Sequence, residues 1–215
     1  MVVVVDVLRA TSAIVTGFDH GVNVMVAVAG IEETLSYKDK GYLVAGERNG
    51  EMQEGFDFGN SPFSYKPEVV KGRNVAISTT NGTQAVVAAK DSHKLFIGAF
   101  LNISALCKRI LNENRDVIVL CAGWKNKFNL EDTLFAGALA EKLAGNGYLL
   151  NCDSALAAIE LWKNAKPDVN AFLATSSHRN RLKHLDLEAD IKYCLTLDLC
   201  KSVPELEAGV LVWKD

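Results

Sequence analysis

Short apolar runs alternate with longer amphipathic stretches over the first two thirds of the chain, a pattern typical of α/β proteins. The first run, Val2 to Val5, is unbroken and β-branched, which favours a strand buried on both faces. The pattern predicts strands at residues 2–5, 23–28, 42–45, 74–78, 94–99 and 116–121. It predicts helices at residues 10–18, 31–40, 84–90, 102–112 and 130–143, and a structured loop at 51–67 with a short helix from Ser61.

The last third of the chain departs from this alternation. Residues 151–163 and 168–185 read as helices, and Pro167 suits a first helical turn. Residues 190–197 and 209–213 read as strands. No Ser- or Gly-rich linker interrupts the chain, so we expect one compact body over residues 1–215.

Two segments of the chain align with each other without a gap. Asp6 falls on Ser78, and the register continues until Ala27 falls on Ala99. We therefore expect a three-layer α/β/α fold with two pseudo-repeats of a β-α-β-α-β unit, approximately residues 1–72 and 73–150. C-terminal helices and strands at 151–215 complete it. The alternative is that all βαβ units look alike, because Val, Ile and Ala recur on buried elements.

Composition and charge narrow the function classes. The 215 residues are 49% hydrophobic and 23% charged, as in globular proteins, and the net charge of -3 gives no basic field for nucleic acid or membrane surfaces. No apolar run approaches the roughly 20 residues that span a bilayer. No signal peptide is recognisable, and the chain begins inside its first strand, which leaves room for a natural segment before Met1. The five cysteines are scattered and odd in number, so we expect reduced thiols in a cytoplasmic protein.

Polar clusters follow four of the predicted strands or the loops after them. They are Asp6-Arg9-Thr11, Gly46-Glu47-Arg48, Thr79 to Thr83, and Glu131-Asp132. Strand ends and helix starts gather at one edge of an α/β sheet, so these clusters are expected to meet there. Carboxylates with hydroxyls suit Mg²⁺, whereas arginines and helix N-termini suit phosphate. The combination favours metal-assisted phosphoryl transfer.

Each cluster has a structural alternative. Asp6 and the stretch from Thr79 to Thr83 are also what helix caps and turns require, and Glu131 with Asp132 suits a helix dipole. Glu47 with Arg48 could be a surface ion pair. The chain has no GxGxxG, GxxxxGK[ST] or GxSxG motif, which argues against nucleotide-binding folds of those types and against an α/β-hydrolase.

The ordered series DVLRAT, GERNG with GFDFGNSP, STTNGT, CAG before LEDTLFAG, and SSHRNRL resembles the 2-phosphosulfolactate phosphatase family over nearly the whole chain. The resemblance implies a three-layer α/β/α protein with duplicated halves. It also implies Mg²⁺-dependent hydrolysis of 2-phospho-3-sulfolactate to 3-sulfolactate and phosphate, a step in coenzyme M biosynthesis. Two positions depart from the family pattern: Asn49 replaces a glycine of GERGG and Ser12 replaces a threonine of RATT.

On this reading Asp6 is a metal ligand or an attacking carboxylate, although Leu8 breaks the DxDxT pattern of aspartyl-nucleophile phosphatases. Glu47 and Asp132 are further metal candidates, and Glu131 is a candidate general base. Arg9 and Arg48 are expected to neutralise phosphoryl and sulfonate oxygens. The candidates for holding the substrate are Thr11, Arg48, Asn60, Ser61, Thr79, Thr80, Asn81, Thr83, Ser177 and His178.

Two other functions remain open from the sequence. One is hydrolysis of a different small phosphorylated hydroxy acid, and the other is a Rossmann-like module that binds a nucleotide without hydrolysing it. The expected partner is a small anionic organic phosphate, not nucleic acid or a membrane, and a homo-oligomer is compatible with the sequence.

Overall fold

The computed structural model describes residues 1–125 and 127–214, and it shows how the apolar runs form a sheet. The strands are β1 (Val2–Val5), β2 (Val24–Ala27), β3 (Leu43–Arg48), β4 (Glu51–Met52), β5 (Asn74–Ser78), β6 (Leu95–Gly98), β7 (Ile118–Cys121), β8 (Glu205–Glu207) and β9 (Val210–Val212). The α-helices are α1 (Ala10–Asp19), α2 (Ile31–Ser36), α3 (Pro67–Val70), α4 (Gly82–Ala89), α5 (Ile103–Glu113), α6 (Leu130–Ala144), α7 (Asp153–Ala165), α8 (Val169–Phe172), α9 (Ser177–Leu182) and α10 (Glu188–Cys194). Single 3₁₀ turns are η1 (Tyr37–Lys40), η2 (Pro62–Ser64), η3 (Phe100–Asn102) and η4 (Lys183–Leu185).

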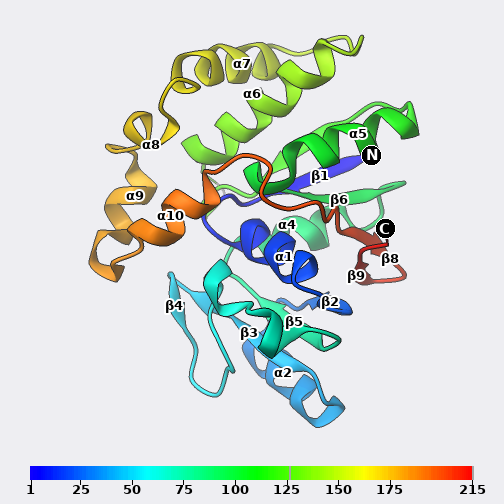
Figure 1. Cartoon of the computed structure of the whole chain (residues 1–215), viewed down its shortest axis with the longest axis vertical. Helices are drawn as coiled ribbons and strands as arrows, with labels where there is room; N and C mark the ends of the chain where they lie inside the picture. The colour runs from blue at the N-terminus through cyan, green and yellow to red at the C-terminus, as the bar shows by residue number, and fades with distance from the viewer. Residues whose placement is uncertain (126, 215) are drawn as a thin grey trace.

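The sheet is mixed, with strand order β4-β3-β5-β2-β9-β8-β6-β1-β7 over the described residues. β1 lies between β6 and β7, and β5 lies between β2 and β3, all in parallel. The antiparallel hairpin β8-β9 joins these two groups of three strands. In Figure 1, α1 and α4 lie between the two groups, α5 to α7 cover β1 on its other side, and α2 lies beyond β3. Helices therefore cover both faces of the strands, which confirms the predicted α/β class and its α/β/α layering.

Each of the two groups takes its middle strand from the other half of the chain. Without β4, β8 and β9, the strand order is β3-β5-β2-β6-β1-β7. If each strand of the first predicted repeat is exchanged with its counterpart in the second (β1 with β5, β2 with β6, β3 with β7), the same order is obtained in reverse. That order is compatible with the predicted duplication. The duplication itself stays a prediction, because strand order alone does not superpose the two segments.

The residues of β1 are buried on both faces, as the unbroken valine run predicts. Val4 packs into the cluster around α1 and α4 with Phe18 and Ile97, whereas Val3 and Val5 pack against α5 to α7 on the opposite face. β1 is thus held rigidly, and the residues that follow it are fixed in position at its carboxyl end.

Three predictions in the last third are wrong or incomplete. Residues 190–197 do not form a strand, because residues 188–194 form α10, whose buried residues Asp190, Ile191 and Cys194 follow helical spacing. Pro167 lies in a turn before α8 and not in its first turn; Asp168 is the N-cap and accepts a hydrogen bond from Ala171. Strand β8 was not predicted at all.

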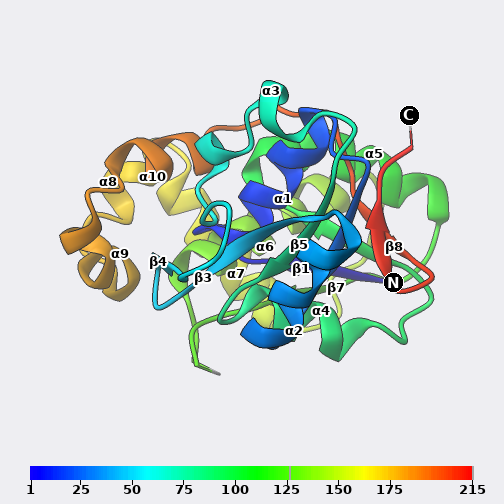
Figure 2. The same ribbon diagram turned by 90° about the horizontal axis from the view of Figure 1, so that it is seen from below.

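The helices of this last third gather at one end of the molecule. Figures 1 and 2 both place α8, α9 and α10 beside β4, at the end where β1 and β3 terminate. Within the part of the chain that the structure describes, no helix is both long and apolar enough to cross a membrane.

Candidate active site

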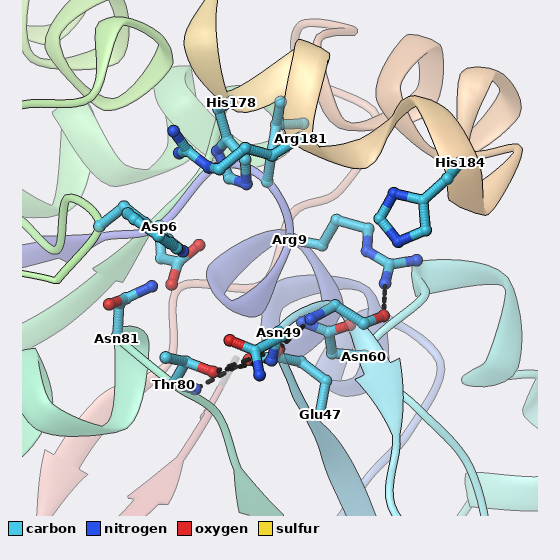
Figure 3. A pocket seen from close by; sticks show the side chains of 13 residues that line it. Asp6, Arg9, Glu47, Asn49, Asn60, Thr80, Asn81, His178, Arg181 and His184 are labelled. Atoms are coloured by element: carbon cyan, nitrogen blue, oxygen red, sulfur yellow. Dashed lines mark hydrogen bonds between the residues drawn. The ribbon is translucent and has the colours of Figure 1, made fainter.

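A cavity of about 210 Å³ lies at this end of the molecule. Its walls come from β1, β3, the turn before α4, the loop after β7 and helix α9 (Figure 3). The predicted site residues that line it are Asp6, Arg9, Glu47, Asn60, Thr80, Asn81 and His178. Residues from distant parts of the chain thus meet at one sheet end, as predicted.

Asp6 directly follows β1, and the turn after it is built by Thr11. The Thr11 hydroxyl donates to the Asp6 carbonyl at 3.0 Å and accepts from the Asp6 N–H at 3.1 Å, so Thr11 shapes the turn and does not line the cavity. Burial raises the pKa of the Asp6 carboxyl to about 7; His178 opposes this shift, and Glu47 and Glu131 add to it. Asp6 is therefore a buried acid whose charge calls for a cation.

Helix α4 approaches this carboxyl closely because its first residue is glycine. A Cβ on Gly82 would lie 2.7 Å from Cβ of Ala10 and 3.0 Å from Oδ2 of Asp6. The N-terminal turn of α4 is closed by Thr79 and Thr83, whose hydroxyls lie 3.2 Å apart and whose backbone N–H groups each donate to the other's hydroxyl. These two threonines are buried structural residues outside the cavity wall.

Glu47 is held in place at the end of β3. Its Oε1 accepts from the Thr80 N–H at 2.8 Å, and its Oε2 accepts from the Gly50 N–H at 2.6 Å and from the Thr80 hydroxyl at 3.3 Å. Thr80 thus orients the carboxylate and lines the cavity with it. Arg48 points elsewhere: its guanidinium donates to the carbonyls of Glu47 and Ala29 and to Ser78, and it does not line the cavity.

Glu131 and His178 form a buried pair behind the cavity. The Glu131 carboxylate is 1% exposed and contacts Nδ1 of His178, which leaves Nε2 as the other ring nitrogen on a side chain that lines the cavity. The second oxygen of Glu131 has no hydrogen-bond partner among the described residues. Glu131 therefore reaches the site through His178 and not directly.

Asp132 lies outside the cavity wall. Its carboxylate accepts from the N–H of Val7 at 2.9 Å and of Gly123 at 3.0 Å, so it ties the loop after β1 to the loop after β7. Burial, followed by the charges of Glu131 and Asp6, raises its pKa well above the usual range. Its geometry is that of a structural carboxylate, and it does not support the predicted role as metal ligand.

Arg9 is already engaged. Nη1 lies 2.8 Å from the Asp190 carboxylate of α10 in a buried contact, and Nη2 donates to the Gly50 carbonyl at 3.1 Å in a partly buried one. Ser61 and Ser177 do not line the cavity, although Ser177 accepts from Arg181. Asn60 does line it, and its buried Oδ1 has no partner among the described residues.

Comparison with known proteins decides the family. The sequence matches the family model described as 2-phosphosulpholactate phosphatase over residues 1–209. Proteins named probable 2-phosphosulfolactate phosphatase are similar over nearly their whole length. That of Thermotoga maritima is 39% identical over 99% of this chain and 92% of its own. That of Caldanaerobacter subterraneus subsp. tengcongensis is 37% identical over 98% and 89%.

The chain belongs to this family. Family membership makes it a phosphoric monoester hydrolase, which confirms the resemblance found in the sequence. A role as a nucleotide-binding module without hydrolysis receives no support from these relatives.

The residues present fit a Mg²⁺ ion of the kind a phosphatase uses. Mg²⁺ needs one or two carboxylates, with water and substrate phosphate completing its octahedron. Asp6 and Glu47 line the cavity, and the unpartnered Oδ1 of Asn60 is a further oxygen donor. No group of three or more His, Cys, Asp or Glu side chains suited to a metal occurs among the described residues, so substrate and water would have to complete the shell.

Sequence reasoning missed part of the cavity wall, above all Arg181 and Trp124. A usable signal was present: Arg181 stands three residues after His178, so both project from the same face of one helical turn. Asn49 and His184 also line the cavity and were not predicted.

Proposed function

We propose that this protein hydrolyses 2-phospho-3-sulfolactate to 3-sulfolactate and phosphate with Mg²⁺. One observation carries the proposal: a cavity of about 210 Å³ brings the carboxylates of Asp6 and Glu47 together with Arg181 and the Glu131-supported His178. A small polyanion with an ester oxygen needs these groups: carboxylates for a cation, an arginine for a free anion, and a proton donor for the leaving group.

Asp6, Glu47 and Asn60 would hold the Mg²⁺ ion. When bound, Mg²⁺ supplies neutralisation of the negative charge on the phosphoryl oxygens. The two carboxylates fix that position, since Glu47 is anchored by three donors and Asp6 by its place at the end of a buried strand. An attack by Asp6 on phosphorus is the alternative use of the same carboxyl.

The phosphoryl group would lie against the N-terminal turn of α4. Thr80 and Asn81 line the cavity there, and the first N–H groups of the helix carry partial positive charge. The close approach of Gly82 to Asp6 keeps this turn beside the carboxylate. Phosphoryl oxygens would thus contact helix donors and the cation simultaneously.

His178 would protonate the leaving oxygen of sulfolactate. Glu131 contacts Nδ1 and holds the ring in place, so the remaining nitrogen, Nε2, is the one that would give its proton to the substrate. As water bonds to phosphorus and the ester P–O bond breaks, the alkoxide takes the proton of His178. A proton of the attacking water then restores the ring, so one water is consumed and 3-sulfolactate and hydrogen phosphate are formed. General acid catalysis is needed here because an alkoxide is a poor leaving group.

Phosphate release tests the proposal directly. The panel comprises 2-phospho-3-sulfolactate, 2-phospholactate, phosphoglycolate and a nucleoside monophosphate, each with Mg²⁺ and with EDTA. We expect Mg²⁺-dependent release that is fastest from the sulfonated substrate. Faster release from another phosphorylated hydroxy acid would move the function to that substrate, and release unaffected by EDTA would contradict the metal role.

The proposal extends to a metabolic role and to a cellular location. The product chemistry suits a step in coenzyme M biosynthesis. The five cysteines, all free in the structure, support a reducing, cytoplasmic location.

A further inference from the structure

Arg181 is the arginine of the cavity wall with unused hydrogen-bonding capacity. Its Nε and Nη2 are buried and have no partner among the described residues, whereas Nη1 donates to Ser177 at 3.2 Å. Nε and Nη2 share one edge of the guanidinium, so both open donors point in the same direction. A buried, unmatched pair of cationic donors calls for an anion that supplies two oxygens.

Trp124 fixes the plane of this guanidinium. The Arg181 Cζ lies 4.2 Å from the centroid of the Trp124 ring, and Nζ of Lys125 lies 4.5 Å from the same ring. Stacking on an aromatic face holds the planar fork at low entropic cost. The open edge of Arg181 is therefore pre-oriented before any ligand arrives.

The other two arginines nearby are occupied, which sets Arg181 apart. Arg9 is paired with Asp190, and Arg179 on the same helix donates to both carboxylate oxygens of Glu188 and to Asn170. Figure 3 shows Arg181 beside His178 on the wall opposite Glu47 and Thr80, with Asp6 on one side between them. The open arginine thus faces the proposed cation and phosphoryl position across the cavity.

We propose that Arg181, laid on Trp124, binds the sulfonate of the substrate and thereby sets the preference for a sulfonated hydroxy-acid phosphate. This inference rests on the proposed function. The phosphate and the sulfonate sit on adjacent carbons, so one anion can lie at α4 while the other reaches the opposite wall. A sulfonate is a weakly basic anion that competes poorly for Mg²⁺, and a bidentate guanidinium suits its oxygens.

The test compares two substrates that differ only in the sulfonate, 2-phospho-3-sulfolactate and 2-phospholactate. The measured quantity is the ratio of their kcat/KM values in the wild type, in Arg181→Met and in Lys183→Met. Lys183 is exposed, lies two residues away and does not line the cavity, so its variant controls for the loss of one positive charge. Thermal unfolding of each variant reports on folding.

We expect the ratio to fall by about 10- to 100-fold in Arg181→Met, the loss typical of a buried charged hydrogen bond, and to stay at the wild-type value in Lys183→Met. A ratio unchanged in Arg181→Met overturns the inference, even if both activities fall, because Arg181 would then act on the phosphoryl group or the carboxylate, which both substrates share. An equal fall in Lys183→Met also overturns it, because it would reduce the effect to general charge.

Calorimetry separates this inference from the proposed function. If the wild type hydrolyses neither substrate, the proposed function fails, and titration with 3-sulfolactate still examines Arg181. Tighter binding of 3-sulfolactate, but not of lactate, to the wild type than to Arg181→Met supports the sulfonate site, because both ligands carry the carboxylate. Equal binding overturns it.

Discussion

At the scale of single residues, Asp6 is held in a fixed position after β1, and burial makes the negative charge of its carboxylate unfavourable. Asp6→Asn should lower kcat by at least about a thousandfold, because it removes a charge that the transition state needs, while the fold stays intact. Steady-state kinetics with thermal unfolding as control checks this. Near-normal kcat with slightly lower stability would show that Asp6 only caps the turn.

The same carboxyl predicts a pH dependence of stability in metal-free protein. Its pKa of about 7 in the folded state exceeds the ordinary value of an aspartate, so the folded state binds more protons over the interval between the two. The free energy of unfolding should therefore fall as pH rises from about 4 to 7, by on the order of a few kcal/mol. Urea titrations should show a smaller fall in Asp6→Asn; equal slopes would contradict the burial argument.

His178 offers a sharper test of chemistry. His178→Gln should reduce turnover of the sulfolactate ester by about 10²- to 10⁴-fold, and turnover of p-nitrophenyl phosphate far less, because that leaving group needs no proton. His184→Gln is the matched control, since His184 also lines the cavity but is exposed and lies in η4, the 3₁₀ turn directly after α9. Equal losses on both esters would assign His178 to binding.

At the scale of elements, α10 contacts the cavity wall through the buried ion pair between its Asp190 and Arg9. Asp190→Asn should destabilise the protein by about 3–5 kcal/mol, because it leaves Arg9 buried with only the Gly50 carbonyl as partner. KM should rise as well, since Arg9 itself lines the cavity, and α9, which precedes α10 in the chain, supplies His178 and Arg181 to the cavity wall. Denaturant unfolding measures the first effect, with Glu188→Gln as the surface control. No change in stability would contradict the importance of this pair.

The elements also show what sequence patterns can and cannot predict. Val2–Val5 and residues 74–78 were correctly placed as strands, because a buried parallel strand needs an apolar run whatever surrounds it. Residues 190–197 were misread, because their β-branched and aromatic side chains favour a strand locally. In the structure these residues form helix α10, and Asp190 of that helix pairs with Arg9, which is 181 residues away. Local sequence does not reveal a contact at that distance.

The site follows the same division. Residues that follow a strand directly, such as Asp6 and Glu47, could be predicted because the sheet edge gathers them. The spacing from His178 places Arg181 on the same helix face, but local sequence does not show whether Arg181 or Arg48 keeps unpaired donors. Arg48 donates hydrogen bonds to backbone carbonyls, whereas two donors of Arg181 have no partner among the described residues. This difference depends on contacts between segments that are distant in the sequence.

At the scale of the whole molecule, the proposed duplication makes a geometric prediction. Residues 1–46 should superpose on residues 73–123 by a single rotation, β1 on β5 and α1 on α4. An experimental structure checks this by superposition of Cα atoms. Segments that need different rotations for strands and helices would show that the matching sequence register arose from the general composition of βαβ units.

The placement of β1 also bears on how the chain folds during synthesis. Val2 pairs with Leu95 and with Ile118, so the first strand has no neighbour in the sheet until β6, at residues 95–98, has been made, and no second neighbour until β7 follows. The early segment cannot finish its own group either, because β5 fills the space between β2 and β3. During synthesis, β1 therefore cannot enter the sheet before its partner strands have been made, and its apolar valine segment stays exposed until then. Neither half is expected to fold as an isolated fragment, and the chain should unfold in one cooperative transition.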